Sequence, residues 1–131
     1  MELFQEQLKS EPFWMLIGCI LMNRSKWKSV EPVLGTIRKR WPTPEALAAV
    51  PYETLIKVVA PVGIQSRKTL NILEFAEMWV ILPPANAEEV YMMPGCGEYA
   101  SDSWRIFVEE NTSVRPSDSI LKHYLEKKRS C

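Results

Sequence analysis

The amino-acid sequence predicts an all-α protein, and three features support this fold class. Apolar residues recur every three to four positions along most of the chain, which is the period of a helix. Ten prolines and five glycines divide the 131 residues into short segments. Strict alternation of apolar and polar residues, which marks a half-buried strand, is almost absent. We therefore expect a compact all-α domain of many short helices.

The length and composition indicate a single folded domain over residues 1–131. A chain of this size typically buries roughly two-thirds of the surface that its unfolded form exposes, and 47% of these residues are apolar. One core can therefore stabilise the fold. The 16 basic residues are balanced by 16 acidic residues, which excludes a broad positive field for nucleic-acid binding. Any contact with DNA must then be local and geometric.

The cysteines and the apolar runs restrict the class of protein further. Cys19, Cys96 and Cys131 lie far apart, without the spacing of a zinc site, an iron–sulfur cluster or a secreted disulfide framework. We therefore expect no metal site and a reducing, intracellular setting. No apolar run approaches the ~18 residues of a membrane span, and the first ten residues carry charges where a signal peptide would be apolar. The sequence thus predicts no association with a membrane.

The first half of the chain predicts short helices around one central apolar helix. Residues 13–22, opened by Pro12, are apolar nearly all round and should form a buried helix. A break at 23–25 precedes a helix over 26–41, with the cations of 38–40 at its end, where they suit the helix dipole. The other expected elements are an amphipathic turn at 1–8, a helix capped at 43–45 that runs to 50, and a helix over 51–59.

The second half predicts a long helix and then a helical hairpin. A break at 60–63 precedes the helix over 66–80, and a proline-rich corner at 82–84 follows it. Two helices at 87–92 and 98–110 are then joined by a tight turn.

The last predicted element is a helix that runs to residue 128. The preceding stretch, 111–117, is too polar and β-branched to be helical. Either Ser117 or Asp118 can cap this last helix.

The most specific feature is the sequence Met-Pro-Gly-Cys-Gly-Glu-Tyr-Ala at residues 93–100. Gly95 and Gly97 let the backbone take conformations that a side chain would forbid, and the following helix presents its free N–H groups. Such a turn suits a DNA phosphate, because backbone dipoles replace lysines in the contact. An ordinary tight turn between helices explains the same residues, so the spacing alone leaves both interpretations open.

These residues resemble a known enzyme family. The hairpin 94–97, followed by Asp118 within 114–118, is similar to the helix-hairpin-helix motif and catalytic aspartate of the helix-hairpin-helix (HhH-GPD) superfamily of base-excision DNA glycosylases. The resemblance covers nearly the whole chain and is closest to the thymine/uracil mismatch glycosylase domain of the methyl-CpG-binding glycosylase. Further matching positions are Pro12, Asn23, Arg24, Pro61, Gly63, Tyr99, Asp102, Ser103, Arg105, Ile106 and Phe107.

The resemblance implies a monofunctional enzyme with the compact multi-helix fold of that superfamily. Such an enzyme flips out a thymine or uracil mispaired with guanine, hydrolyses its N-glycosidic bond and leaves an abasic site. The residues keep three alternatives open: a non-catalytic helix-hairpin-helix module that binds DNA, a glycosylase for another damaged base, and an all-helical protein-interaction domain. Ser119 and Ile120 stand where the relatives are more basic, a departure that affects the base preference.

Asp118 and Tyr99 are the catalytic residues that the resemblance implies. A carboxylate near the anomeric carbon stabilises the positive charge that develops on the sugar and can activate water. Asp118 is the candidate, and its alternative role is a helix N-cap. Bifunctional relatives hold a lysine at the position of Tyr99, which forms a Schiff base with the sugar. Tyrosine cannot form that imine, so Tyr99 is expected to line the base pocket or, alternatively, to pack at the helix start.

The resemblance also implies contacts with the base and with DNA. Gln5 would read the extruded pyrimidine through its amide, unless it is a solvated surface residue. Arg24 would fill the vacated stack, and Ile64 would press beside the widowed base. Their alternatives are a capping or phosphate-binding arginine and a core isoleucine. Further DNA contacts are expected at Pro94, Gly95, Gly97, Ser103 and Arg105.

The expected partner is double-stranded DNA with a mismatched or damaged base. The protein is expected to act as a monomer, in the nucleus or nucleoid with the DNA. No cofactor is expected, because the four-cysteine cluster module of many family members is missing; a monovalent cation at the hairpin carbonyls is the one addition left open.

Overall fold

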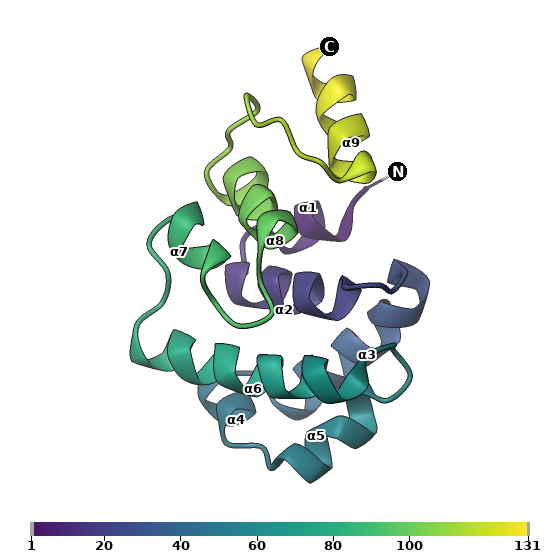
Figure 1. Cartoon of the computed structure of the whole chain (residues 1–131), viewed down its shortest axis with the longest axis vertical. Helices are drawn as coiled ribbons and strands as arrows, with labels where there is room; N and C mark the ends of the chain where they lie inside the picture. The colour runs from purple at the N-terminus through teal and green to yellow at the C-terminus, as the bar shows by residue number, and fades with distance from the viewer. Residues whose placement is uncertain (1, 131) are drawn as a thin grey trace.

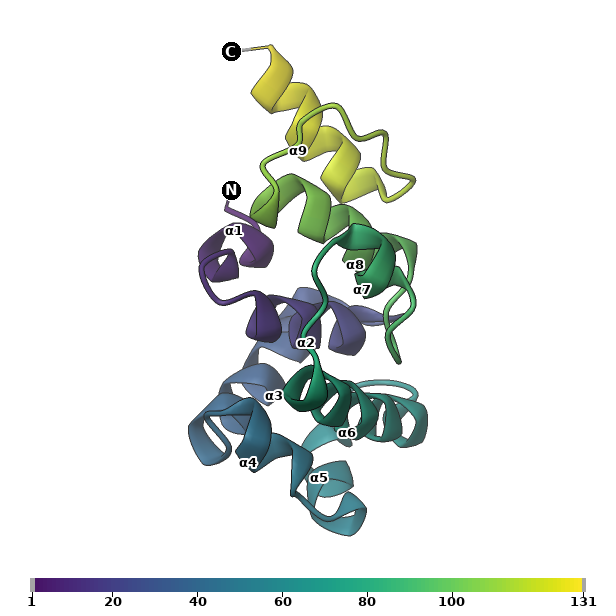
Figure 2. The same cartoon turned by 90° about the vertical axis from the view of Figure 1, so that its left-hand side faces the viewer.

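A computed structural model describes residues 2–130 as a wholly helical fold, which confirms the predicted fold class. Met1 and Cys131, the first residue of the expected N-terminal turn and the third cysteine, lie outside these residues. Figure 1 and Figure 2 show an elongated arrangement with both ends of the chain in the same half. The elements are α1 (Phe4–Leu8), α2 (Pro12–Met22), α3 (Trp27–Arg40), α4 (Pro44–Ala48), α5 (Tyr52–Val59), α6 (Gln65–Ile81), α7 (Ala87–Tyr91), α8 (Glu98–Ser103), the π-helix η1 (Trp104–Val108) and α9 (Ser119–Arg129).

Helix α2 is the centre of the molecule, as its uniform apolarity predicts. Every residue from 13 to 21 is buried. In both views α2 lies between two groups of helices, with α3 to α6 on one side and α1, α8 and α9 on the other. Pro12 occupies the first turn, where the missing N–H costs no hydrogen bond. The pocket described below opens at the C-terminal end of this helix.

The helices of the first group pack their apolar faces on α2 and on one another. Helix α3 buries Val30, Val33, Leu34 and Ile37, the spacing of one helix face. Helix α4 begins at Thr43, whose side-chain oxygen accepts a hydrogen bond from the Ala46 N–H, so the predicted cap is confirmed.

The expected continuous helix over 98–110 is a different structure. Helix α8 ends at Ser103, and the chain continues as the π-helix η1. The Glu109 N–H donates to the Trp104 carbonyl at 3.0 Å, five residues back. Trp104, Ile106 and Phe107 of this wider turn are buried, and such single-turn π segments are rare within helices.

Helix α9 is attached through the extended stretch before it. Leu121 and Leu125 are fully buried. Near its C-terminus the Arg129 guanidinium donates hydrogen bonds to the carbonyl oxygens of Thr112 and Val114. This contact ties the end of α9 back to the stretch that leads into Asp118. No helix within residues 2–130 combines the length and hydropathy that a membrane span requires.

Candidate active site

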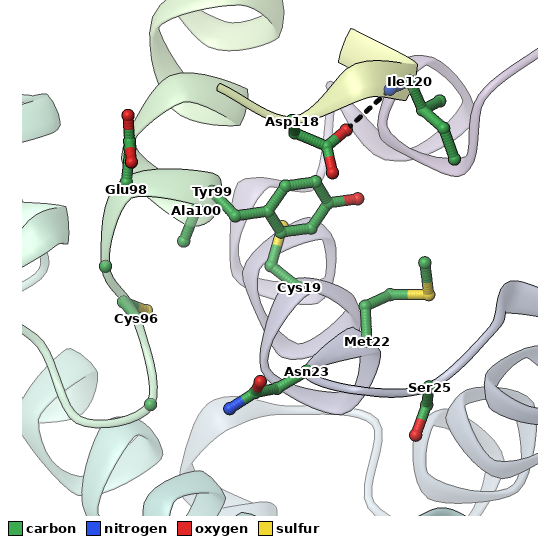
Figure 3. A pocket seen from close by; sticks show the side chains of 12 residues that line it. Cys19, Met22, Asn23, Ser25, Cys96, Glu98, Tyr99, Ala100, Asp118 and Ile120 are labelled. Atoms are coloured by element: carbon green, nitrogen blue, oxygen red, sulfur yellow. Dashed lines mark hydrogen bonds between the residues drawn. The ribbon is translucent and has the colours of Figure 1, made fainter. Parts of the chain in front are cut away.

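A pocket of about 390 Å³ opens at the C-terminal end of α2, between the hairpin turn and the start of α9. Figure 3 shows its side chains converging from these three segments. The walls are formed by Cys19, Met22, Asn23 and Ser25, by residues 95–100, and by Asp118 and Ile120.

The Asp118 carboxylate belongs both to this pocket and to the start of α9. Its Oδ2 accepts hydrogen bonds from the N–H groups of Ile120 at 3.1 Å and Leu121 at 3.0 Å. The carboxylate lies beside the Tyr99 ring in Figure 3. Asp118 is therefore the helix cap, as expected, and also a pocket residue; its catalytic role stays a prediction. Ser117, the other candidate cap, instead donates its hydroxyl to the Glu98 carboxylate at 2.9 Å.

Tyr99 lines the pocket from the first turn of α8. Its hydroxyl accepts a hydrogen bond from the Gln5 amide nitrogen at 2.7 Å. Burial raises the pKa of Tyr99 well above its usual range, and the nearby Cys19 and Asp118 raise it further. The phenol therefore keeps its proton at neutral pH and is available as a hydrogen-bond donor inside the pocket.

Gln5 and Ser103 form a buried support behind Tyr99. Gln5 is only 1% exposed, so the alternative of a solvated surface glutamine is wrong. Its amide nitrogen also donates to the Ser103 hydroxyl at 3.3 Å, and that hydroxyl donates to the Tyr99 carbonyl at 2.9 Å. A direct contact between Gln5 and a base stays a prediction.

Ser103 requires a correction. Its side chain is fully buried, so the expected contact between Ser103 and a DNA phosphate is wrong. The reason is the face of α8 on which it lies: that face turns toward Gln5 in α1 rather than toward solvent.

Arg24 and Ile64 lie in neighbouring breaks beside the pocket end of α2. Both are exposed and both adopt the left-handed backbone conformation, with φ of 56° and 58°. This conformation is strained for a β-branched residue. The side chain of Ile64 is 40% exposed, so its alternative role as a core residue is wrong. A side-chain carbon on Gly63 would lie 4.0 Å from the Arg24 carbonyl oxygen, which places the two breaks side by side.

The hairpin turn requires glycine at one of its two glycine positions. Gly95 has φ of 75°, and a side-chain carbon there would lie 2.9 Å from Asn71 Cβ and 3.1 Å from Ile20. Gly97 is extended, with φ of 173°, so the conformational freedom expected of Gly97 is not needed. A side-chain carbon added to Gly97 would meet no other atom within 4 Å, so this side of the start of α8 is open. Contacts of Pro94, Gly95 and Gly97 with a phosphate stay predictions.

Arg105 lies in η1, directly after α8, among acidic residues. Its guanidinium is 3.2 Å from the Glu88 carboxylate and 3.3 Å from that of Asp102. Burial raises the pKa of Asp102, the repulsion of Glu98 adds to this rise, and Arg105 opposes it. Because two carboxylates already compensate the Arg105 charge, the geometry gives no support to a phosphate contact, which stays a prediction.

The pocket thiols are not set up as nucleophiles or metal ligands. Burial raises the pKa of Cys19 to about 12 and also raises that of Cys96. Within residues 2–130 no cluster of three or more histidine, cysteine or acidic side chains could hold a metal ion. In the hairpin, the Met93 carbonyl accepts a hydrogen bond from the Cys96 N–H at 3.0 Å. A monovalent cation at these carbonyls stays a prediction.

Sequence reasoning missed the wall that the end of α2 contributes. Met22, Asn23 and Ser25 line the pocket together with Ile120. The sequence carried one relevant signal, the break at 23–25 directly after an apolar helix. At Ile120 the relatives are more basic. Because Ile120 lines the pocket, this difference lies where it can affect the base preference.

Comparison with known proteins identifies the sequences and the fold that this chain resembles. The model of the HhH-GPD superfamily, base excision DNA repair proteins, matches residues 17–129. A methyl-CpG-binding domain protein 4-like protein of Arabidopsis thaliana is 25% identical over 128 residues, which are 93% of this chain and 27% of that protein. A thymine-DNA glycosylase of Aeropyrum pernix is 23% identical over 94 residues, 69% of this chain and 42% of that protein.

The fold also matches a solved structure. A thermostable thymine-DNA glycosylase superimposes with a TM-score of 0.75 at 16% identity, over 86% of this chain and 53% of the other. The chain thus spans between about a quarter and about half of the length of the proteins that it matches.

Proposed function

Because the chain belongs to the HhH-GPD superfamily of base excision DNA repair proteins, we propose that it is a monofunctional DNA glycosylase. Its substrate is thymine or uracil paired with guanine, and its product is an abasic site. The observation that carries this proposal is the Asp118 carboxylate at the pocket beside Tyr99 (Figure 3). The names of the similar proteins, thymine-DNA glycosylases among them, support the class of base.

The first step of the proposed reaction is the extrusion of the target nucleotide. A base inside a duplex is out of reach, and its rotation into a pocket costs a few kcal/mol, less when it is mispaired. Arg24 and Ile64 are exposed next to the pocket. Arg24 would fill the gap in the stack, and Ile64 would press on the remaining base.

The second step breaks the bond between the sugar carbon C1′ and the base nitrogen. The electron pair leaves with the pyrimidine as an anion, which takes a proton from water. Positive charge develops on the sugar, and the Asp118 carboxylate stabilises it. Water then adds to C1′ and loses its proton to the carboxylate or to solvent.

Neutral donors at the pocket suit a leaving pyrimidine. The Tyr99 hydroxyl and the Asn23 amide can donate to its carbonyl oxygens, and among residues 2–130 no lysine, arginine or histidine lines the pocket. Tyrosine at position 99 cannot form a Schiff base, so the strand stays intact after base loss.

The proposed partner is double-stranded DNA, bound by one copy of the protein in the compartment that holds the DNA. The alternative of a non-catalytic DNA-binding module shares the same hairpin and differs only in chemistry.

Labelled duplexes with single G·T, G·U, A·oxoguanine and alkylated-purine sites test the proposal, with hot alkali to reveal abasic sites. We expect strand cleavage after alkali at G·T and G·U, and none without alkali. Asp118→Asn should lose base release and still bind the duplex. Release only at another lesion contradicts the substrate, and salt-dependent binding without release at any lesion favours the binding module.

A further inference from the structure

Lys68 is a charged side chain inside the core, and no step of the proposed reaction uses it. It lies in the first turns of α6 and is 1% exposed. None of the ion pairs within residues 2–130 includes it. Burial lowers the pKa of this ammonium group. The burial of a cation without a paired carboxylate costs free energy. The hydrogen bonds of the ammonium group must offset this cost, so they indicate the role of Lys68.

The ammonium group of Lys68 holds the break that carries Arg24. It donates to the Leu21 carbonyl at 2.7 Å and to the Ser25 hydroxyl at 2.8 Å. The Leu21 carbonyl is one of the last four of α2, which lack partners inside the helix and favour a cation. The two acceptors thus flank Arg24 on either side along the chain.

The backbone of the same residue holds the break that carries Ile64. The Lys68 N–H donates to the Ile64 carbonyl at 3.0 Å. Ile64 directly precedes α6 and has the strained left-handed conformation, as Arg24 does. Strained residues persist where surrounding contacts enforce them. One residue therefore contacts both segments that would enter the duplex.

We infer that Lys68 is a positioning residue that holds the Arg24 and Ile64 breaks in a fixed relation, so that the two side chains enter the duplex as one unit. This inference rests on the proposed function. A methionine of similar length would fill the same space but could not donate to Leu21 and Ser25. Lys68→Met therefore removes the side-chain half of the connection, keeps the backbone hydrogen bond to Ile64, and leaves Asp118 and Tyr99 unchanged.

The test compares base release from a G·U duplex with release from uracil in a single strand, where no stacked partner must be displaced. Lys68→Met should lower release from the duplex by roughly tenfold to a hundredfold, the range in which a displacement of about 1 Å acts. Release from the single strand should stay near the wild-type rate. Lys68→Arg, which keeps the donors, should recover part of the loss.

The matched control is Leu47→Ala in α4, a fully buried site away from the pocket. Leu47→Ala shows how much general destabilisation alone lowers base release. Both variants are compared at a temperature where they are folded to the same extent. The inference is overturned if Lys68→Met lowers base release from the duplex and from the single strand equally. It is also overturned if the ratio of the two release rates is the same in Lys68→Met and in Leu47→Ala.

Amide hydrogen exchange of the DNA-free protein gives a second readout that does not depend on activity. Lys68→Met should speed exchange at residues 22–25 and at 63–65 beyond the level of Leu47→Ala. Unchanged exchange, or faster exchange in one segment only, contradicts the proposed connection. If the wild type releases no base from either substrate, the proposed function fails, and exchange still decides the role of Lys68.

Discussion

At the scale of single residues, Asp118 caps α9 and lines the pocket, so the proposed catalytic role and the structural role fall on one carboxylate. Oδ2 accepts the two N–H groups at the start of α9, and the group as a whole lies beside Tyr99 at the pocket. The exposed N–H groups of a helix start favour negative charge, and negative charge is what would stabilise a cationic sugar. The cap therefore holds the proposed catalytic group in place.

Two substitutions separate these roles. Asp118→Ala removes the cap and should lower the free energy of unfolding by about 1 kcal/mol. Asp118→Asn keeps an oxygen that can accept the same N–H groups, so it should stay close to wild type. Both should lose base release. Urea denaturation measures the first difference, and Asp118→Ala with wild-type stability would contradict the cap.

The protonation of Tyr99 leads to a prediction on pH dependence. Burial raises the pKa of this phenol, so its ionisation falls beyond the usual pKa of about 10. The folded protein thus keeps the neutral donor throughout the physiological range, and the phenol should cause no alkaline fall in base release up to about pH 9. Tyr99→Phe should lower the rate at every pH without changing the shape of the profile. A fall near pH 9 that Tyr99→Phe abolishes would contradict this account.

At the scale of elements, the sequence predicts most helices because proline, glycine and capping residues mark their ends. Pro12 and Thr43 begin helices where expected. The π-helix after α8 has no such local signal, since its wider turn accompanies the burial of three nearby apolar residues. The burial of Ser103 likewise depends on contact with Gln5, which is 98 residues away in the sequence. Local pattern cannot predict either feature.

The break before α6 gives a prediction about stored strain. Ile64→Gly suits φ of 58° and should raise the free energy of unfolding by up to about 1 kcal/mol. It should also lower base release from a G·U duplex, because the apolar side chain is lost. Ile64→Ala is the matched control, with the same loss of contact but less relief. Thermal unfolding checks the sign, and a clearly destabilised Ile64→Gly would contradict the strain.

At the scale of the whole molecule, the pocket exists because three segments far apart in the sequence meet at one end of α2. They are residues 19–25, 95–100 and 118–120. Spacing alone predicts the hairpin and a capped last helix, and the family resemblance supplies Asp118 and Tyr99. Asn23 and Ile120 could not be assigned to the pocket without the packing of α8 and α9, because each is an ordinary loop or helix residue in its local sequence.

Because the chain has no net charge, its affinity for DNA should depend on a few local cations, and this leads to a prediction. A cation inserted into the stack also neutralises nearby phosphates, and each phosphate charge neutralised changes the slope of log affinity against log salt by about 0.9. Arg24→Gln should therefore reduce the magnitude of the slope by about 1. Lys39→Gln is the control, because Lys39 lies far from the pocket. Its neighbour in α3, Arg38, pairs with Glu11 at the N-terminal end of α2, whereas the pocket lies at the C-terminal end. Titration at several salt concentrations measures both, and an unchanged slope for Arg24→Gln would contradict its place at the DNA.

The central claim is that an extruded pyrimidine nucleotide enters this pocket and meets the carboxylate of Asp118. A crystal structure of the Asp118→Asn protein with a G·U duplex tests it most directly. The account predicts the uracil out of the helix, its base against Tyr99 and its C1′ in van der Waals contact with residue 118. A uracil still stacked in the duplex, or seated in a cavity away from Tyr99, would contradict it.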